Sequence, residues 1–281
     1  MVELKSFENG FEYLEITNAS SSAKIALQGA HIFEYKCADK EDMLWLSDTS
    51  AFERGTAIRG GVPICWPAFG MNNPELPQHG FSRTAMFEFK SSREIDTNTT
   101  EVLLLLKETQ KSLELWNYKF ELEFKVLVSN ALEMELKSTN RDTKEFKLTQ
   151  ALHSYFRVSD ISNAVVIGLN NKPRLDALTN KIFTQKSDIV FKEEFDSVFQ
   201  KVKNKIVLQD KLNGKTREVS IKNEGSSSVV VWNPWIEKGA RMSGMRADAY
   251  REFVCIESAN AYEDFRVLKQ NELHTLRVTL H

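Results

Sequence analysis

The sequence predicts an all-β protein, a large antiparallel β-sandwich with few short helices. Apolar and polar residues alternate with a period of two in many short segments, and a helical pattern is scarce. The best helical candidate is Glu237–Tyr250, which Gly239 and Gly244 weaken. The 281 residues contain no repeat and no low-complexity linker, so we expect one β-sandwich domain over residues 1–281.

The clearest strands are two consecutive segments. Apolar side chains stand at every second position of Phe120–Val128 and again of Leu132–Lys137, with mostly Glu and Lys between them. The residues Ser129-Asn130-Ala131 separate the two as a turn, which predicts a hairpin with one face in water. Further short strands are expected at Phe11–Thr17, Lys24–Leu27, Val102–Lys107, Lys147–Phe156, Val219–Lys222, Val229–Trp232, Phe253–Glu257 and His274–Leu280.

One segment has a different composition. Gly55–Gly80 holds five glycines and four prolines, which predicts an elaborate loop rather than a regular element. Long loops in compact proteins are usually functional or disordered. Apolar residues such as Ile64, Trp66 and Phe69 favour an ordered, functional loop here.

Composition and charge exclude several classes of protein. Lys and Arg number 37 against 39 Asp and Glu, which argues against a nucleic-acid-coating protein. The longest strictly apolar run, Val102–Leu106, is far short of the roughly 20 residues of a membrane span, and the first residues lack a secretory apolar region. Cys37, Cys65 and Cys255 are scattered and form no CxxC pair. We therefore expect a cytoplasmic protein with no nucleic-acid or membrane partner.

Familiar cofactor motifs are missing from the sequence. It contains no GxGxxG, GxxxxGK[ST], HExxH or GxSxG string, which removes the simple routes to a dinucleotide, nucleoside triphosphate, zinc-protease or hydrolase function. No cluster of His, Cys, Asp and Glu has metal-ligand spacing. We expect no cofactor and no metal.

His153 is the first candidate catalytic residue. It stands in LTQALHSYFRV, among apolar neighbours that predict a buried strand. A histidine titrates near pH 6.5 and can act as acid or base at neutral pH. The alternative is a core histidine bonded to a carbonyl group, and this residue alone does not decide between the two.

Glu257 is the second candidate. It directly follows the apolar residues 253–256, so it lies at the end of a buried strand or inside a pocket. Burial raises the pKa of a carboxyl group and makes it a better base. The alternative is a glutamate that turns outward at the end of the strand.

Arg59, His79 and Arg83 lie in or beside the Gly/Pro-rich loop. Arg59 precedes two glycines, where backbone can approach a ligand closely. Two guanidinium groups on one loop system can hold a phosphate through charge-assisted hydrogen bonds. The alternative is two surface arginines paired with carboxylates such as Glu53 or Glu75.

The string VVWNPWIEK at 230–238 holds two tryptophans and a lysine. Trp232 and Trp235 could stack on the apolar face of a sugar, or simply pack at the end of a strand. Lys238 could support an anion or remain solvated.

Together, five segments resemble the hexose-6-phosphate mutarotases, also called glucose-6-phosphate 1-epimerases, of the galactose-mutarotase-like superfamily. The resemblance implies a large antiparallel β-sandwich of the supersandwich type. It also implies an isomerase that interconverts the α and β anomers of an aldohexose 6-phosphate, most of all glucose 6-phosphate. The segments are IRGGVPICWPAFG at 58–70, PQHGFSRTAMFEF at 77–89, LTQALHSYFRVSDI at 148–161, VVWNPWIEK at 230–238 and FVCIESANA at 253–261.

The resemblance also implies roles for individual residues. The catalytic histidine of the family falls on His153 and its catalytic glutamate on Glu257, while its loop arginines and a substrate-positioning histidine fall on Arg59, Arg83 and His79. Glu257 would act as the base at O1 and protonated His153 as the acid at O5 when the sugar ring opens.

The sequence departs from the family in two places. Asp196 stands in FDSVF, where the family usually has an Asp-Arg-Val-Tyr-like string, so Ser197 and Phe199 replace its arginine and tyrosine. Ala68 interrupts the usual Trp-Pro-Trp-Phe string. Asp196 and Trp232 are still expected to bind the substrate, but the replacements at Ser197 and Phe199 leave open the sugar-ring contacts of the Asp196 segment.

Three other functions compete with this one. A mutarotase of unphosphorylated aldoses would not need both Arg59 and Arg83. A non-catalytic sugar-binding sandwich need not retain both His153 and Glu257. A glycoside hydrolase needs two carboxylates across the scissile bond, and only Glu257 can be nominated. The expected partner is a small hexose phosphate, bound by a monomer.

Overall fold

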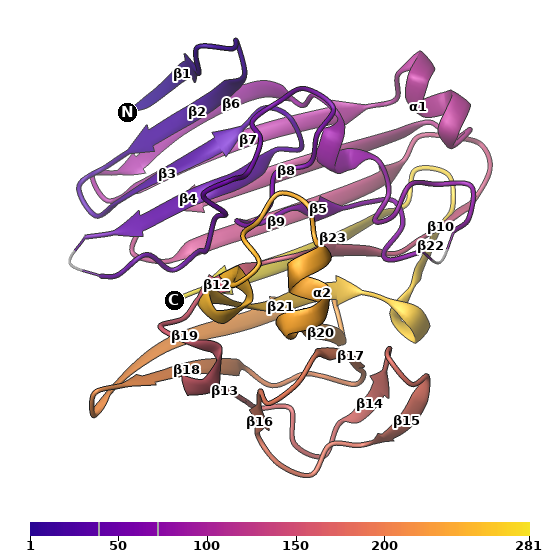
Figure 1. The fold of residues 1–281 in the computed structure, drawn as a ribbon. Helices are drawn as coiled ribbons and strands as arrows, with labels where there is room; N and C mark the ends of the chain where they lie inside the picture. The colour runs from indigo at the N-terminus through magenta and orange to yellow at the C-terminus, as the bar shows by residue number, and fades with distance from the viewer. Residues whose placement is uncertain (39, 72) are drawn as a thin grey trace.

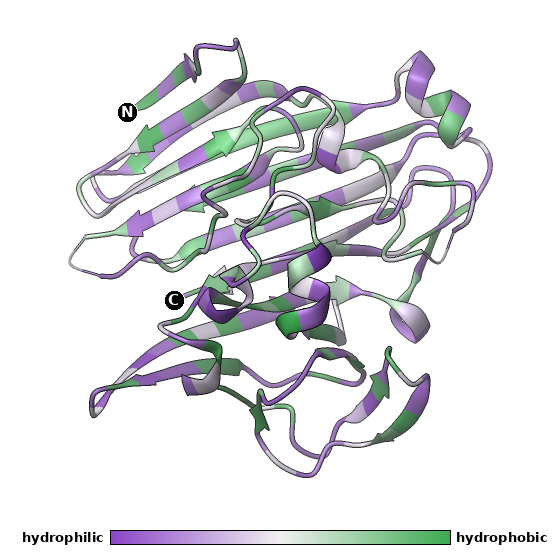
Figure 2. Cartoon of the chain, viewed as in Figure 1, coloured by the Kyte–Doolittle hydropathy of each residue, from purple (hydrophilic) through white to green (hydrophobic). Residues whose placement is uncertain are grey.

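The computed structural model describes residues 1–38, 40–71 and 73–281. Antiparallel strands dominate the described part of the chain, as expected from the period-two pattern (Figure 1), and they form two large and two smaller sheets. Hydrophobic and hydrophilic bands alternate along the long strands (Figure 2), because successive side chains of a strand point to opposite faces.

The largest sheet has nine strands. Its hairpin of β8 and β9 confirms the predicted pair of half-buried strands, joined by a turn at 129–131. In spatial order the strands are β16 (Ile189–Val190), β13 (Ala164–Ile167), β18 (Ile206–Leu212), β19 (Lys215–Glu224), β23 (Leu273–Leu280), β9 (Leu132–Asn140), β8 (Phe120–Val128), β7 (Thr99–Lys107) and β6 (Glu88–Asp96).

The second sheet has eight strands and carries the candidate site residues His153, Glu257, Trp232 and Asp196 on or beside its strands. In spatial order these strands are β15 (Lys181–Thr184), β14 (Pro173–Asp176), β17 (Phe195–Phe199), β20 (Ser228–Asn233), β21 (Phe253–Asn260), β11 (Gln150–Leu152) and β5 (Ile64–Cys65), with β12 (Tyr155–Arg157) also paired to β21.

Two smaller sheets complete the fold. A four-stranded sheet carries the N-terminal strands, and a two-stranded ribbon joins residues far apart in the chain. Their strands are β1 (Val2–Ser6), β2 (Glu12–Thr17), β3 (Ser21–Ala26) and β4 (His31–Cys37) in the first, and β10 (Phe146–Leu148) and β22 (Arg266–Leu268) in the second. β14 and β15 lie at the opposite end of the molecule from β1 and β2 (Figure 1).

One face of the eight-stranded sheet packs on the apolar face of the nine-stranded sheet. The main apolar cluster contains Val231 and Ile256 from the first sheet and Phe124, Leu136 and Val278 from the second. This is the sandwich that the sequence predicts. The opposite face of the eight-stranded sheet carries the candidate site residues.

The helices are short, as expected, and the helix predicted over Glu237–Tyr250 forms only in its first part. α2 spans Trp235–Arg241 only, and its C-cap Met242 is extended, with φ −79° and ψ 133°. Gly244 then has φ +75°, a left-handed conformation that ends helical propagation. A separate 3₁₀ turn forms at Ala249–Glu252. The other α-helix, α1 (Gln110–Leu115), was not predicted.

The predicted strand Lys147–Phe156 is also divided. It forms β10, which pairs with β22, and β11 and β12, which both pair with β21. His153 and Ser154 lie between β11 and β12, where the His153 amide donates instead to the Pro63 carbonyl at 3.0 Å. This interruption falls at the candidate catalytic residue.

Candidate active site

His153 and Glu257 face each other across two neighbouring strands. Leu152 pairs with Ser258 and Tyr155 with Cys255, so the same register places His153 opposite Glu257. His153 Nε2 lies 3.2 Å from Glu257 Oε1. Glu257 does not turn outward: it is 2% exposed, and His153 is 8% exposed.

Each member of this pair has a second polar atom without a protein partner. His153 Nδ1 and Glu257 Oε2 are buried and make no hydrogen bond in the described part of the chain. A buried polar group without a partner is costly. These two atoms are therefore suited to receive a polar ligand.

The sheet register brings further site residues onto the same face. Trp232 pairs with Cys255 on one side and with Asp196 on the other, so all three share the face that carries Glu257. The Trp232 ring lies 6.0 Å from the His153 ring and nearly perpendicular to it. Trp232 is 8% exposed and packs with Phe253, so it forms a wall of the site.

The long loop brings His79 to the same place. Its ring lies 5.7 Å from that of His153, edge-on, and its Nδ1 accepts a hydrogen bond from the Gly70 amide at 3.2 Å. Gly80 holds this conformation with φ +74°, because it lies directly against the Trp66 carbonyl group. Trp66 and Gly80 also form an isolated parallel bridge.

Arg59 and Arg83 have no carboxylate partner in the described part of the chain, so the alternative pairing with Glu53 or Glu75 is not observed there. Arg59 donates to the Tyr155 hydroxyl at 3.4 Å and to the Ser243 carbonyl at 3.5 Å, both long contacts. The Nε atoms of both arginines are buried without a hydrogen bond. Two partly unsatisfied guanidinium groups beside the same site can bind an anion.

Asp196 lies at the other side of the site, next to a lysine. Lys238 Nζ is 2.8 Å from Glu194 and 3.7 Å from Asp196, and it stands 5.8 Å from the centre of a Trp232 ring. Lys238 is therefore ion-paired rather than simply solvated.

The electrostatics of the site favour uncharged forms of the central pair. Burial lowers the pKa of His153 well below its usual 6.5, and the neighbouring His79, Arg83 and Arg59 lower it further. Burial also raises the pKa of Glu257 well above 4.5, with Asp196 adding to the rise and Arg83 opposing it. A neutral imidazole beside a neutral carboxyl group places the carboxyl proton of Glu257 within reach of His153 Nε2.

The loop histidine is uncharged too. Burial lowers the pKa of His79 to about 3, and Arg83 and Arg59 contribute to the shift. Burial likewise raises the pKa of Asp196 above 3.8, against the opposing effect of Lys238. Because Nδ1 accepts from the Gly70 amide, neutral His79 carries its proton on Nε2 and can donate one hydrogen bond to a ligand.

Comparison with known proteins identifies the family. The aldose 1-epimerase family model matches residues 12–281. The chain belongs to the aldose 1-epimerase family. An Escherichia coli relative named "Putative glucose-6-phosphate 1-epimerase" is 33% identical over 270 residues, covering 94% of this chain and 88% of the relative. A relative of the same name from Cenchrus ciliaris is 35% identical over 289 residues, covering 99% and 87%.

A solved structure of this family has the same fold. The crystal structure of a "putative mutarotase (YeaD)" from Salmonella typhimurium superposes with a TM-score of 0.91 at 30% identity, covering 99% of this chain and 92% of that one. The expected supersandwich fold of the galactose-mutarotase-like proteins is thereby confirmed, and this family member is an epimerase.

Two residues of this epimerase site were not among the predicted site residues. Tyr155 contacts both His153 and Arg59, and Lys238 pairs with Asp196. The sequence does carry a signal for Tyr155, because it stands two residues after His153 and so shares its face of the strand. The pairing of Lys238 depends on the packing of α2 on β17, which no local pattern reveals.

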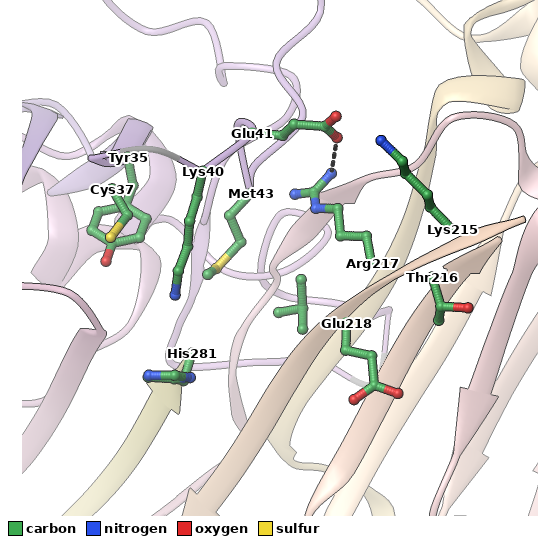
Figure 3. A pocket seen from close by; sticks show the side chains of 11 residues that line it. Tyr35, Cys37, Lys40, Glu41, Met43, Lys215, Thr216, Arg217, Glu218 and His281 are labelled. Carbon is green, nitrogen blue, oxygen red and sulfur yellow. Dashed lines mark ion pairs between the residues drawn. The ribbon is translucent and has the colours of Figure 1, made fainter. Parts of the chain in front are cut away.

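Away from the site, a cavity of about 480 Å³ lies between β19 and the chain that follows β4 (Figure 3). Arg217 Nη1 and Glu41 Oε2 approach to 3.7 Å beside it. None of its described lining residues is a candidate site residue. The described chain has no cluster of three or more His, Cys, Asp or Glu placed for a metal, and no described helix is long and apolar enough to cross a membrane.

Proposed function

We propose that this epimerase interconverts the α and β anomers of an aldohexose 6-phosphate, glucose 6-phosphate above all. One observation carries the proposal: a buried His153–Glu257 pair, 3.2 Å apart, stands beside two arginines without carboxylate partners. The pair suits proton transfer at C1 of a sugar, and the arginines suit its phosphate. The names of the relatives support the same substrate.

The reaction requires the C1–O5 bond to break and re-form. Glu257 takes the proton of the C1 hydroxyl group while protonated His153 gives a proton to O5. The C1–O5 bond breaks, its electron pair stays on O5, and C1=O1 becomes an aldehyde. Rotation about the C1–C2 bond then presents the other face of C1. Closure returns the proton of the O5 hydroxyl to His153 and the Glu257 proton to O1.

The geometry of the pair fits this sequence. O1 and O5 are both bonded to C1, so two groups that are close to each other can engage both oxygens. Ring opening leaves His153 neutral and Glu257 protonated, the forms that burial favours. The direct contact between Nε2 and Oε1 gives the Glu257 proton a short route to His153, and this transfer forms the charged pair with which ring opening begins.

The remaining residues of the site would position the substrate. Arg59 and Arg83 would hold the 6-phosphate, and neutral His79 would donate from Nε2 to a sugar hydroxyl, since its Nδ1 accepts from Gly70. Asp196 and Trp232 would contact the sugar from the side of the site formed by β17 and β20. No resident metal or cofactor takes part in the proposed steps.

The proposal extends to the setting of the protein. Cys37, Cys65 and Cys255 are free thiols, which suits a reducing compartment such as the cytoplasm. Action as a monomer remains a prediction, which sedimentation or light scattering of the purified protein would test.

The test is anomer-resolved NMR exchange spectroscopy. Exchange between α and β signals is measured for glucose, mannose and galactose 6-phosphates, beside free glucose and galactose, with and without enzyme. We expect the largest acceleration for glucose 6-phosphate. Equal or greater acceleration for the free sugars would favour a mutarotase of unphosphorylated aldoses, and no acceleration of any sugar would favour a binding protein.

A further inference from the structure

Tyr155 lies between the proton-transfer pair and the arginines. Its ring stacks on that of His153 with 4.9 Å between ring centres and only 14° between their planes. At its other end, the hydroxyl group accepts a hydrogen bond from Arg59 Nη1 at 3.4 Å. One side chain thus contacts a candidate catalytic residue and a candidate phosphate ligand.

The surroundings of Tyr155 hold it in place. It is 3% exposed, and its ring packs against Trp45, Trp232 and Phe253. Its amide donates to the Gly61 carbonyl at 2.9 Å, and its carbonyl accepts from the Trp45 amide at 3.0 Å. A side chain that is held in one rotamer by packing on several sides can orient the side chains that contact it.

His153 depends on such support. Its only polar side-chain contact in the described chain is the one to Glu257, since its Nδ1 has no partner. A histidine in a catalytic pair usually has its second nitrogen held by a hydrogen bond, which sets the ring plane. Here the stacked Tyr155 ring is the flat surface that sets the plane of the imidazole.

Arg59 depends on Tyr155 in another way. The contacts of its guanidinium group to Tyr155 and Ser243 are long, at 3.4 and 3.5 Å, and its Nε is unpartnered. The hydroxyl group therefore uses only one N–H donor of Arg59, and most of the donors of the guanidinium group stay available to an anion.

We infer that Tyr155 is a positioning residue that orients both the His153 imidazole and the Arg59 guanidinium, through its ring and its hydroxyl group respectively. The inference rests on the proposed function, because only that function identifies the anion bound by Arg59 as the 6-phosphate of a sugar. It assigns separable effects to the two parts of one side chain: the ring acts on the chemical step and the hydroxyl group on phosphate binding.

The experiment compares three purified variants with the wild type. Tyr155→Phe removes only the hydroxyl group, and Tyr155→Leu removes the stacked ring as well. Tyr35→Phe is the matched control, because Tyr35 is equally buried and its hydroxyl group donates to the Ser129 carbonyl at 2.8 Å, outside the site. For each protein we measure kcat and KM for anomer exchange on glucose 6-phosphate, and the Kd for inorganic phosphate by ³¹P NMR.

For Tyr155→Phe we expect KM and the phosphate Kd to rise about threefold to tenfold, the loss of one hydrogen bond, with kcat within twofold. For Tyr155→Leu we expect kcat to fall roughly tenfold to a hundredfold as well, because a misplaced acid–base group slows the chemical step. Tyr35→Phe should change none of the three quantities. A loss of stability alone would not divide KM from kcat in this way.

Two results would overturn the inference. One is a Tyr155→Phe variant with an unchanged phosphate Kd and KM. The other is a folded Tyr155→Leu variant with the kcat of Tyr155→Phe. If the wild type exchanges glucose 6-phosphate, either result removes the role of Tyr155 and leaves the proposed function standing. If the wild type does not exchange the anomers of glucose 6-phosphate, the proposed substrate is wrong. The phosphate Kd values of the wild type and Tyr155→Phe then test by themselves whether the Tyr155 hydroxyl group contributes to anion binding.

Discussion

Gly80 lies so close to Trp66 that a Cβ on Gly80 would overlap the Trp66 carbonyl oxygen. The contact fixes the path of the chain between His79 and Arg83, two residues of the site. Gly80→Ala should therefore lower the free energy of unfolding by roughly 2–5 kcal/mol, from backbone strain and the clash together, and should also slow anomer exchange. Urea unfolding measures the first effect.

Gly10 is the matched control for this substitution. It has φ +78°, close to the +74° of Gly80, but nothing lies within 4 Å of an added Cβ. Gly10→Ala should cost only the strain of the left-handed conformation, about 1–2 kcal/mol, and should leave exchange unchanged. Equal losses in the two variants would contradict the claim that close packing at Trp66 shapes the loop.

Loss of either member of the His153–Glu257 pair should lower activity without unfolding the protein. His153→Asn and Glu257→Gln should each lower kcat for anomer exchange by about 10²–10⁴-fold, the usual contribution of a general acid or base. NMR exchange gives the rate, and circular dichroism shows whether the fold is retained. A folded variant with near wild-type exchange would remove that residue from its role.

Glu257→Gln should also change the dependence of stability on pH. Burial raises the carboxyl pKa well above its value near 4.5, so the folded state holds this proton more tightly than the unfolded state. The stability contributed by Glu257 is thus present below pH 4.5 and is lost as pH rises through the folded-state pKa. A neutral glutamine does not ionise, so the free energy of unfolding of the variant should be higher than that of the wild type at pH 8.

Unfolding by urea at pH 4.5 and at pH 8 tests this expectation. The advantage of Glu257→Gln should shrink at the lower pH. Glu237→Gln, on the surface of α2, controls for the loss of one negative charge. A variant less stable than the wild type at pH 8 would mean that the Glu257 carboxylate is stabilised when ionised.

Substitution of either loop arginine should affect phosphorylated sugars more than free sugars. Arg59→Ala and Arg83→Ala should each lower kcat/KM for glucose 6-phosphate roughly tenfold to a hundredfold, since a charge-assisted hydrogen bond contributes about 1.5–3 kcal/mol. Exchange of free glucose should change far less. Arg59→Lys should not restore the loss, because an ammonium cannot reproduce the guanidinium fork.

Arg93→Ala serves as the control in that experiment. Arg93 is exposed on β6 and pairs with Glu101 at 3.2 Å, outside the site. Its loss should leave both substrates unaffected. Equal losses on glucose and glucose 6-phosphate in the Arg59 and Arg83 variants would instead favour a mutarotase of free aldoses.

Exhaustive chelation should leave exchange unchanged, because the proposed chemistry uses only proton transfers between His153, Glu257 and the sugar. The measurement is the NMR exchange rate after dialysis against a chelator. Loss of activity that one added divalent ion restores would refute a metal-free mechanism.

The sequence predicts those strands whose own side chains alternate. β8 and β9 each bury one face, so their pattern is visible without any knowledge of the neighbours. β6 and β15 are exposed along their whole length and show no such alternation. Their pairing depends on partners elsewhere in the chain, which a local pattern cannot reveal.

The same distinction applies to the site. The apolar surroundings of His153 and Glu257 are local in the sequence and pointed correctly to buried polar groups. Their contact, by contrast, depends on the register between β21 and the chain at 152–155. The contact of Arg59 with Tyr155 depends on the long loop, which brings Arg59 to the site. The helix predicted at 237–250 ends at Arg241, and the chain that follows includes Gly244 with φ +75°, a conformation outside a right-handed helix.

The position of β23 has a consequence for synthesis of the protein. This strand pairs with β19 on one side and β9 on the other, in the middle of the nine-stranded sheet. A nascent chain therefore presents two open strand edges until residues 273–280 have emerged from the ribosome. Exposed edges invite pairing with other chains, so chaperones that shield β9 and β19 during translation should raise the yield of folded enzyme.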